Sequence, residues 1–200
     1  MDLGLLVLRG AVGPLMAAHG AGKLFGWFGA GYGVEGTAGY LESLGFRPGK
    51  RYALLAGATE LVGGVGLALG LATPLASAAT IGQMVAAART AHAGKGLWVT
   101  DGGAEYPLTI AAIAAALGHT GPGKYSVDAA LGLDRHGFLP GAVALALGLG
   151  TAQVVLSSRT TDTPPAVEAD PTASPASASD SAASIDVTGT PAGTLGAVGS

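Results

Sequence analysis

Five long apolar stretches constrain the fold of this chain more than any other feature. They are Leu3–Ala21, Tyr52–Ala72, Pro74–Ala93, Tyr106–His119 and Phe138–Leu156. A helix that crosses the hydrocarbon core of a bilayer needs about 20 residues, and only the fourth stretch is clearly shorter. Neither 74–82 nor 108–118 offers a polar face to water, which argues against a soluble bundle. We therefore predict an all-α, polytopic transmembrane helical bundle, with a four-helix core and a fifth, C-terminal transmembrane helix.

The composition supports a membrane protein and excludes several functions. Of the 200 residues, 49% are hydrophobic and 12% charged, whereas soluble domains average about 25% charged residues. The net charge of −3 gives no support for nucleic-acid binding. Without any cysteine, the chain has no disulfides, thiolate nucleophiles, zinc–thiolate sites or iron–sulfur clusters.

Composition also divides the chain into three parts. We predict a four-helix membrane domain over residues 1–130, a further transmembrane helix over 131–158 and a tail over 159–200. From residue 160 onward the tail is rich in Ser, Thr, Ala and Pro, and it contains five acidic residues but no Lys or Arg. Because it has too few large apolar residues to bury, we expect it to be disordered, with a partner-binding segment as the alternative.

The distribution of basic residues predicts the orientation of the helices. With five spans, the side that carries the first-to-second and third-to-fourth connections holds six basic residues and the opposite side two. The six are Lys23, Arg47, Lys50, Arg51, Lys95 and Arg159, and the two are Lys124 and Arg135. The first side is therefore expected in the cytoplasm. A cleaved signal peptide is not expected, since Met1-Asp2 provides no basic leader.

Six ionisable residues lie in or beside the predicted spans: Arg9, His19, Lys23, Glu60, Arg89 and His92. Charges at such positions usually face the bundle interior and find partners. Arg9 and Glu60 can form a buried structural ion pair, or they can belong to a proton relay or polar ligand site. His19 and His92 fit interhelical hydrogen bonds better than metal ligation, because they lack a ligand spacing. We therefore predict no metal site.

Glycines and aromatic residues indicate how the helices pack and where they end. Gly22-x-x-x-Gly26 and Gly66-x-x-x-Gly70 are typical of close helix packing in lipid. Nine of the eleven aromatic residues fall on the expected cytoplasmic side, which suggests that the connections there form a shaped layer. The nine are Phe25, Trp27, Phe28, Tyr32, Tyr40, Phe46, Tyr52, Trp98 and Tyr106.

Three short motifs stand out. The first is H-G-x-x-K-L-F-G-W-F-G over 19–29, which lacks the spacing of a phosphate-binding Walker A loop. The second is E-L-x-G-G, beginning at Glu60. The third is G-G-x-E-Y-P over 102–107, in which Glu105 and Pro107 both fit the first turn of a helix.

Together these motifs resemble the DoxX family of bacterial integral membrane proteins, over about residues 3–130. The family pattern falls on His19, Gly20, Lys23, Gly26, Trp27, Glu60, Gly64, Trp98, Gly103, Glu105, Tyr106 and Pro107. The resemblance implies a four-helix domain in the bacterial plasma (inner) membrane. It also implies association with quinone-linked or oxidative-stress redox systems that include soluble partner enzymes. The fifth span and the acidic tail depart from the family pattern.

The leading functional hypothesis is an accessory subunit of such a redox system. A candidate polar and aromatic pocket would bind a quinone head group through Arg9, His19, Lys23, Trp27, Glu60, His92, Trp98, Glu105 and Tyr106. The chain has no flavin, dinucleotide or iron–sulfur motif, so any catalysis would be that of an oxidoreductase subunit acting with quinone or a partner protein. Two alternatives are a non-enzymatic scaffold that recruits a cytoplasmic enzyme and a small-molecule or proton carrier.

Overall fold

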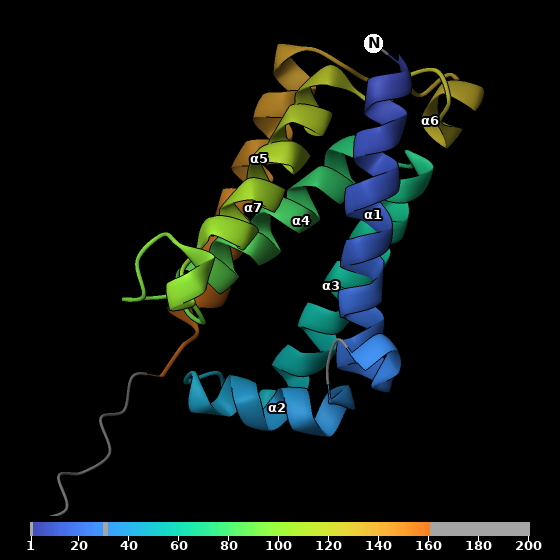
Figure 1. The fold of residues 1–200 in the computed structure, drawn as a ribbon. Helices are drawn as coiled ribbons and strands as arrows, with labels where there is room; N and C mark the ends of the chain where they lie inside the picture. Colours follow the sequence, from blue (N-terminus) through green and yellow to red (C-terminus); the bar gives the residue numbers. More distant parts are fainter. Residues whose placement is uncertain (1, 30–31, 161–200) are drawn as a thin grey trace, which may run out of the picture. The chain divides into compact units, whose positions relative to one another are not determined.

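The computed structural model describes residues 2–29 and 32–160, which fold into helices without any strand in that part of the chain. The elements are α1 (Asp2–Phe25), η1 (Trp27–Gly29), α2 (Gly33–Ser43), α3 (Gly49–Leu69), α4 (Thr73–Ala88), η2 (Val99–Asp101), α5 (Glu105–Thr120), α6 (Val127–Ala130) and α7 (Phe138–Ser157). Figure 1 shows the long helices running between two ends, with α6 near one end and α2 across the other. This confirms the predicted all-α helical bundle.

All five apolar stretches form helices, but they differ in length. Among the described residues, α1, α3 and α7 are long and apolar enough to cross a membrane. Helices α4 and α5 have 16 residues each, which corresponds to about 24 Å at 1.5 Å per residue. The bundle therefore combines three helices of membrane-spanning length with two shorter ones.

The third predicted span is wrong at its C-terminal end, because α4 stops at Ala88 rather than at Ala93. The hydroxyl of Thr90 donates to the carbonyl of Ala86, and glycines with positive φ follow at Gly94 and Gly96. Such local bonds and left-handed glycines favour turns over helix. Arg89 and His92 therefore do not share a helical face. Arg89 instead adds an exposed basic residue beyond the helix end.

Helices α1 and α3 pack with their backbones in contact. A Cβ added at Gly20 would lie 2.3 Å from the backbone nitrogen of Leu61, and one at Gly64 would lie 2.3 Å from that of Ala17. Such close approach through small residues is typical of helix pairs in lipid. Of the two glycine motifs expected to mediate packing, Gly66 does approach Ala76 closely. Gly26 follows the last residue of α1, and a Cβ added there would lie 3.6 Å from the backbone nitrogen of Gly33, which is ordinary contact.

Helices α4, α5 and α7 form a second packed group. A Cβ at Gly82 of α4 would meet the Thr151 hydroxyl of α7 at 2.5 Å, and Gly118 of α5 lies against Ala144 of α7. The α3–α4 turn joins this group to the α1–α3 pair through a tight helical hairpin, and Pro74 lies in the first turn of α4.

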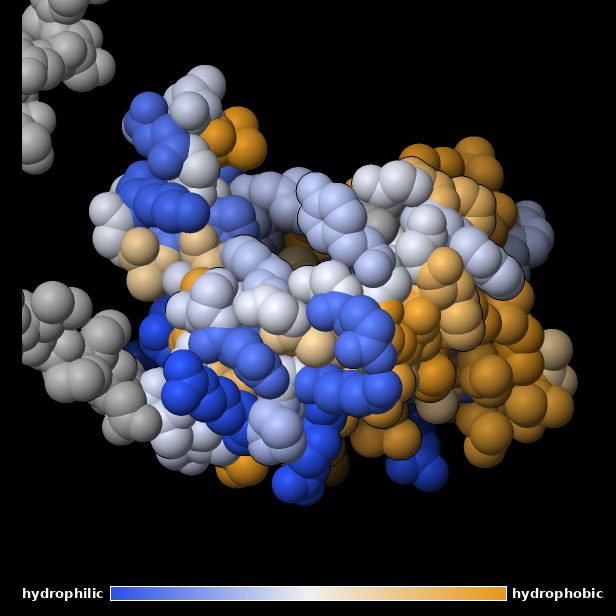
Figure 2. All heavy atoms as spheres, turned by 90° about the horizontal axis from the view of Figure 1, so that it is seen from below, coloured by the Kyte–Doolittle hydropathy of each residue, from blue (hydrophilic) through white to orange (hydrophobic). Residues whose placement is uncertain are grey.

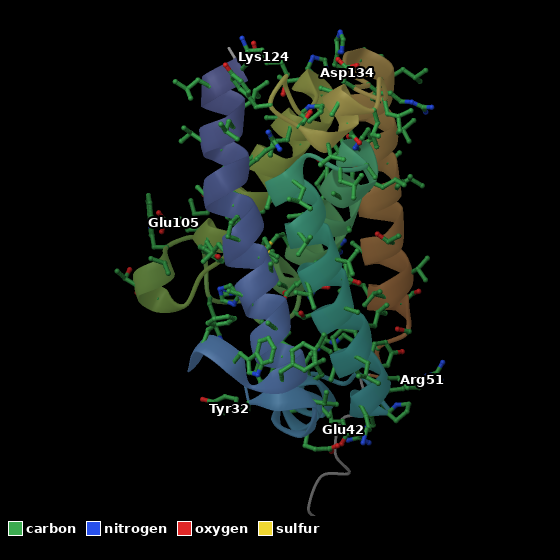
Figure 3. The ribbon with its side chains drawn as sticks, turned by 90° about the vertical axis from the view of Figure 1, so that its right-hand side faces the viewer. Tyr32, Glu42, Arg51, Glu105, Lys124 and Asp134 are labelled. Atoms are coloured by element: carbon green, nitrogen blue, oxygen red, sulfur yellow. The ribbon has the colours of Figure 1, made fainter. Side chains whose placement is uncertain are left out.

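The two ends of the bundle differ in character. We call one the α6 end (Asp2, residues 70–72 and 121–137) and the other the α2 end (residues 26–29, 32–48, 89–104 and 158–160). Figure 3 shows Lys124 and Asp134 at the α6 end, and Tyr32, Glu42 and Arg51 at the α2 end. The sequence treated residues 33–43 as part of a loop, whereas they form α2, which lies across its end (Figure 1). The expected layer of connections is therefore built largely from a helix.

The first residues of the predicted tail contact the α2 end. The Arg159 side chain donates to the carbonyl of Leu44 at 2.6 Å, and the Thr160 amide donates to the carbonyl of Gly45 at 2.9 Å. The Arg159 guanidinium also lies over the Phe46 ring. These contacts place residues 159 and 160 in the folded part, while the rest of the predicted tail lies outside the described residues.

Candidate functional site

Three helices meet at a polar contact near the α2 end. Lys23, in the last turn of α1, donates to one carboxylate oxygen of Glu60 on α3. The other oxygen of Glu60 accepts a hydrogen bond from Gln83 on α4 at 3.3 Å. The Glu60 side chain is 4% exposed and that of Lys23 is 24% exposed. Breaking such a shielded pair leaves an uncompensated charge, which is strongly unfavourable.

An aromatic contact lies on the next turn of α1. His19 is one helical turn before Lys23, and its ring centroid is 6.2 Å from that of Tyr106 at the start of α5. Tyr106 is also within electrostatic range of Glu60. We call Lys23, Glu60, Gln83, His19 and Tyr106 the central site. Its side chains come from four helices and offer both hydrogen-bond donors and acceptors.

Arg9 does not belong to this site, so the predicted Arg9–Glu60 ion pair is wrong. Its guanidinium donates to the carbonyls of Ala68, at 3.2 Å, and Tyr125, at 2.7 Å. Arg9 lies 14 residues before Lys23 on the same helix, or about 21 Å along its axis. Arg9 is only 1% exposed, and its positive charge lies beside the C-terminal carbonyls of α3, where a helix dipole favours a cation.

A second buried charge at the α6 end is Asp128, at the start of α6. Its carboxylate accepts hydrogen bonds from the Ala72 amide at 2.8 Å, the Thr73 amide at 2.9 Å and the Thr73 hydroxyl at 2.8 Å. Asp128 therefore caps the N-terminus of α4, where a helix dipole favours an anion. Arg9 binds the carbonyl of Ala68 before the α3–α4 turn and Asp128 binds Thr73 after it, so both residues have a structural role at this turn.

The connection between α4 and α5 holds three more of the predicted site residues. His92 Nδ1 contacts the carbonyl of Gly102 at 2.7 Å, and a carboxylate oxygen of Glu105 accepts from the Val99 amide at 3.0 Å. Both contacts fold the connection on itself. Trp98 lies between these two residues in the chain, and its side chain is 62% exposed. We find His92 and Glu105 engaged locally rather than in the central site.

Aromatic side chains cover part of the α2 end. Trp27 packs against Phe25 and Phe28, with ring centroids 4.9 and 6.2 Å apart, respectively. Trp27 is nevertheless 57% exposed, Phe28 75% and Tyr32 88%. Seen from this end in Figure 2, polar residues gather over much of the face beside an apolar flank, and a hollow opens near its middle.

The structure thus separates the nine predicted pocket residues into groups. His19, Lys23, Glu60 and Tyr106 come together, whereas Trp27, His92 and Trp98 lie in connections, Glu105 begins α5, and Arg9 lies toward the α6 end. Gln83 was missed, although a carboxamide within an apolar stretch is a signal for interhelical hydrogen bonding. In the described ranges, 2–29 and 32–160, no group of three or more His, Asp or Glu could hold a metal ion.

Comparison with known proteins gives a family. The family model described as DoxX matches residues 4–93, from α1 past the end of α4. Residues 4–93 therefore form a DoxX-family region. The match includes the first two sequence motifs and ends before the third, at 102–107. Among curated proteins nothing matches this chain. No solved structure matches it either. The DoxX-family region and the three helices of spanning length establish a membrane protein associated with the lipid bilayer.

Proposed function

We propose that this protein is an accessory subunit of a redox system in the bacterial plasma membrane, and that its central site binds a quinone head group. The observation that carries the proposal is the Lys23–Glu60–Gln83 contact, a shielded hydrogen-bonded group shared by α1, α3 and α4. A structural ion pair alone would not require Gln83 or the neighbouring His19–Tyr106 contact.

The chemistry of a quinone fits these residues. Each quinone carbonyl accepts hydrogen bonds, and an ammonium group has three N–H donors. Because Glu60 holds Lys23 near the bundle interior, the remaining N–H groups of Lys23 can reach a carbonyl oxygen. The rings of His19 and Tyr106 provide flat surfaces against which a quinone ring can pack. Reduction of a quinone to a quinol takes up two electrons and two protons, and a soluble partner enzyme would supply the electrons.

We propose that the α2 end faces the cytoplasm. The end of α4 at Ala88 moves Arg89 into the connection at that end, so it joins the six basic residues already counted there. An excess of Lys and Arg marks the cytoplasmic side of a membrane protein. A cytoplasmic partner would then approach the same end at which the central site lies.

Quinone binding can be measured directly on the purified full-length protein in mild detergent. Both tryptophans lie at the α2 end, so a benzoquinone with a single isoprene unit should quench their fluorescence in a saturable manner. Lys23→Met removes the proposed donor. A charged hydrogen bond contributes about 1.5–3 kcal/mol, and tenfold in affinity is about 1.4 kcal/mol. We therefore expect about a tenfold or greater loss of affinity.

The matched control is Lys50→Met, since Lys50 lies at the same end but pairs with Glu35 on the exposed surface. It should leave the affinity unchanged. Glu60→Gln should weaken binding as well, because it releases Lys23 from its position. Circular dichroism would establish that each variant is folded. Unsaturable quenching of the wild-type protein, or equal affinity in Lys23→Met, would refute the proposal.

A scaffold role is supported by a different observation, the exposed aromatic residues of the α2 end. Trp27, Phe28 and Trp98 are each more than half exposed, and such side chains are enriched in protein interfaces. A scaffold would co-purify with a soluble enzyme that is lost in Trp27→Ala and Trp98→Ala but retained in Lys23→Met. By contrast, the carrier alternative loses support, because Arg9 lies far from Glu60 and His92 contacts its own connection.

A further inference from the structure

A groove runs along the flank of the bundle, between α3 and α4. Its volume is about 680 Å³, which is within the range of about 300–1,000 Å³ found for small-molecule sites. The lining is formed by small and aliphatic side chains, with Thr59 as the one polar side chain among its lining residues. Representative lining residues are Ala58, Val62, Gly66, Leu75, Ala76 and Ala79.

The lining residues belong to the middle and C-terminal part of α3 and the first half of α4. Val62 and Leu75 are 71% and 63% exposed, so the groove is open on the side of the bundle. For a helix that spans a bilayer, that side meets lipid rather than water. A molecule would therefore enter the groove from within the membrane.

One end of the groove approaches the central site. Ala79 lines the groove, and Gln83 lies four residues further along α4 on the same face, about 6 Å along the axis. On α3, Gly63 lines the groove and Glu60 lies three residues before it. The groove therefore leads to the hydrogen bond between Gln83 and Glu60.

Gln83 has hydrogen-bonding capacity to spare. Its amide nitrogen donates to Glu60, while its carbonyl oxygen accepts no hydrogen bond from residues 2–29 or 32–160. The side chain is only partly buried. A carboxamide can make up to four hydrogen bonds, so a polar head arriving along the groove would first meet Gln83 and then Lys23.

We propose that the α3–α4 groove is the lateral entrance for the quinone and holds its isoprenoid chain, with the head group at the central site. This inference rests on the proposed function and adds the route and the class of ligand: a carbonyl-bearing ring on a long apolar chain. A second groove, between α5 and α7, fits less well. Its lining, which includes Ala115, His119 and Phe138, comes from α5 and α7 and contains no residue of α3 or α4, the helices that carry Glu60 and Gln83.

The test locates the isoprenoid chain of the bound quinone and does not measure the affinity of the quinone. Moving an apolar chain from lipid into an apolar groove gains little hydrophobic free energy, so chain length alone should change binding only slightly. The probe is a benzoquinone with a farnesyl chain that ends in a photoreactive diazirine. It is added to full-length protein in phosphatidylcholine vesicles, and the labelled positions are mapped by mass spectrometry.

We expect the quinone probe to label residues 58–66 and 71–79 several-fold more than the outer face of α7. A phosphatidylcholine carrying the same diazirine in its acyl chain should label both regions about equally. Ala58→Leu fills an exposed part of the groove and should reduce labelling by the quinone probe several-fold. Ala112→Leu makes the same change on an exposed part of α5 outside both grooves and should have no effect.

The outcomes separate this inference from the proposed function. If the one-isoprene quinone binds but the long probe labels all faces evenly or labels the α5–α7 groove, the lateral entrance is wrong and the head-group site remains. If the quinone probe labels Ala58→Leu as strongly as the wild-type protein, the groove is likewise not the entrance for the quinone. If the phospholipid probe shows the same preference for the groove, its occupant is a lipid acyl chain and the inference is overturned. If the one-isoprene quinone itself does not bind, the proposed function fails first.

Discussion

Replacement of Asp128 by alanine should destabilise the protein more than any other single change at the α6 end. Asp128 is 2% exposed, and its carboxylate accepts three hydrogen bonds from Ala72 and Thr73. Loss of a helix cap costs about 0.5–2 kcal/mol, and leaving a buried donor without an acceptor costs about 1–3 kcal/mol. Because the amide and the hydroxyl of Thr73 would both lose their acceptor in a buried position, we expect the free energy of unfolding to fall by about 2–5 kcal/mol.

Reversible unfolding in mixed micelles, followed by tryptophan fluorescence, measures this loss. Both tryptophans lie at the α2 end, so a change in their unfolding midpoint reports cooperative unfolding rather than a local change near Asp128. Asp128→Asn keeps one acceptor oxygen and should be less destabilising than Asp128→Ala. We expect its free energy of unfolding to fall by about 1–2 kcal/mol, for the hydrogen bonds that the amide group cannot accept. Asp134→Ala is the control, because Asp134 is an exposed acid in the same connection.

The double variant Arg9→Met with Asp128→Asn tests whether these two residues also interact. If the two buried charges stabilise each other, the double variant should lose less stability than the sum of the two single variants. One ordinary hydrogen bond contributes about 1 kcal/mol to stability. If the free energy of unfolding of Asp128→Ala differs from that of the wild type by no more than this, the proposed roles of Asp128 and Arg9 are refuted.

Three further predictions follow from the packing. Gly20→Ala places a methyl group against the backbone of Leu61 and should destabilise the protein by about 1–3 kcal/mol, whereas Gly10→Ala, with open space around it, should be neutral or stabilising in the same unfolding assay. Glu105→Ala removes the acceptor of the Val99 amide, so it should lower the free energy of unfolding by about 0.5–1.5 kcal/mol and speed hydrogen exchange over 97–104. An unchanged exchange rate would show that this bond does not hold the connection. Arg159→Ala should speed hydrogen exchange at the C-terminal turn of α7. Equal protection in the variant and the wild type would show that the contact of Arg159 with the turn after α2 does not stabilise the end of α7.

Much of the fold could be predicted from hydropathy, because apolar helices of membrane length are encoded locally. The α2 helix could not, since Gly33, Gly36 and Gly39 reduce its intrinsic helix propensity. Tertiary contacts compensate for this: Thr37 and Ala38 are buried, and the Thr37 hydroxyl lies 3.4 Å from the carbonyl of Lys23. Local sequence does not reveal such contacts.

The partners of the charged residues were harder to predict than their burial. Their positions in or beside an apolar stretch predicted that Arg9 and Lys23 face protein, and both do. A position in the sequence does not show how far along the helix axis an acidic partner lies. Glu60 was therefore assigned to Arg9 although it pairs with Lys23.

The contact between residues 159–160 and the turn after α2 has a consequence for membrane topology. It joins segments 115 residues apart in the sequence, so the chain enters α3 and leaves α7 at neighbouring points. The aqueous compartment that contains α2 must therefore also contain residues 159 and 160. Because both segments lie on the same side, the chain must cross the membrane an even number of times between them. Labelling of a cysteine introduced at Ser43 would therefore assign α2 and residues 159–160 to one compartment in a single measurement.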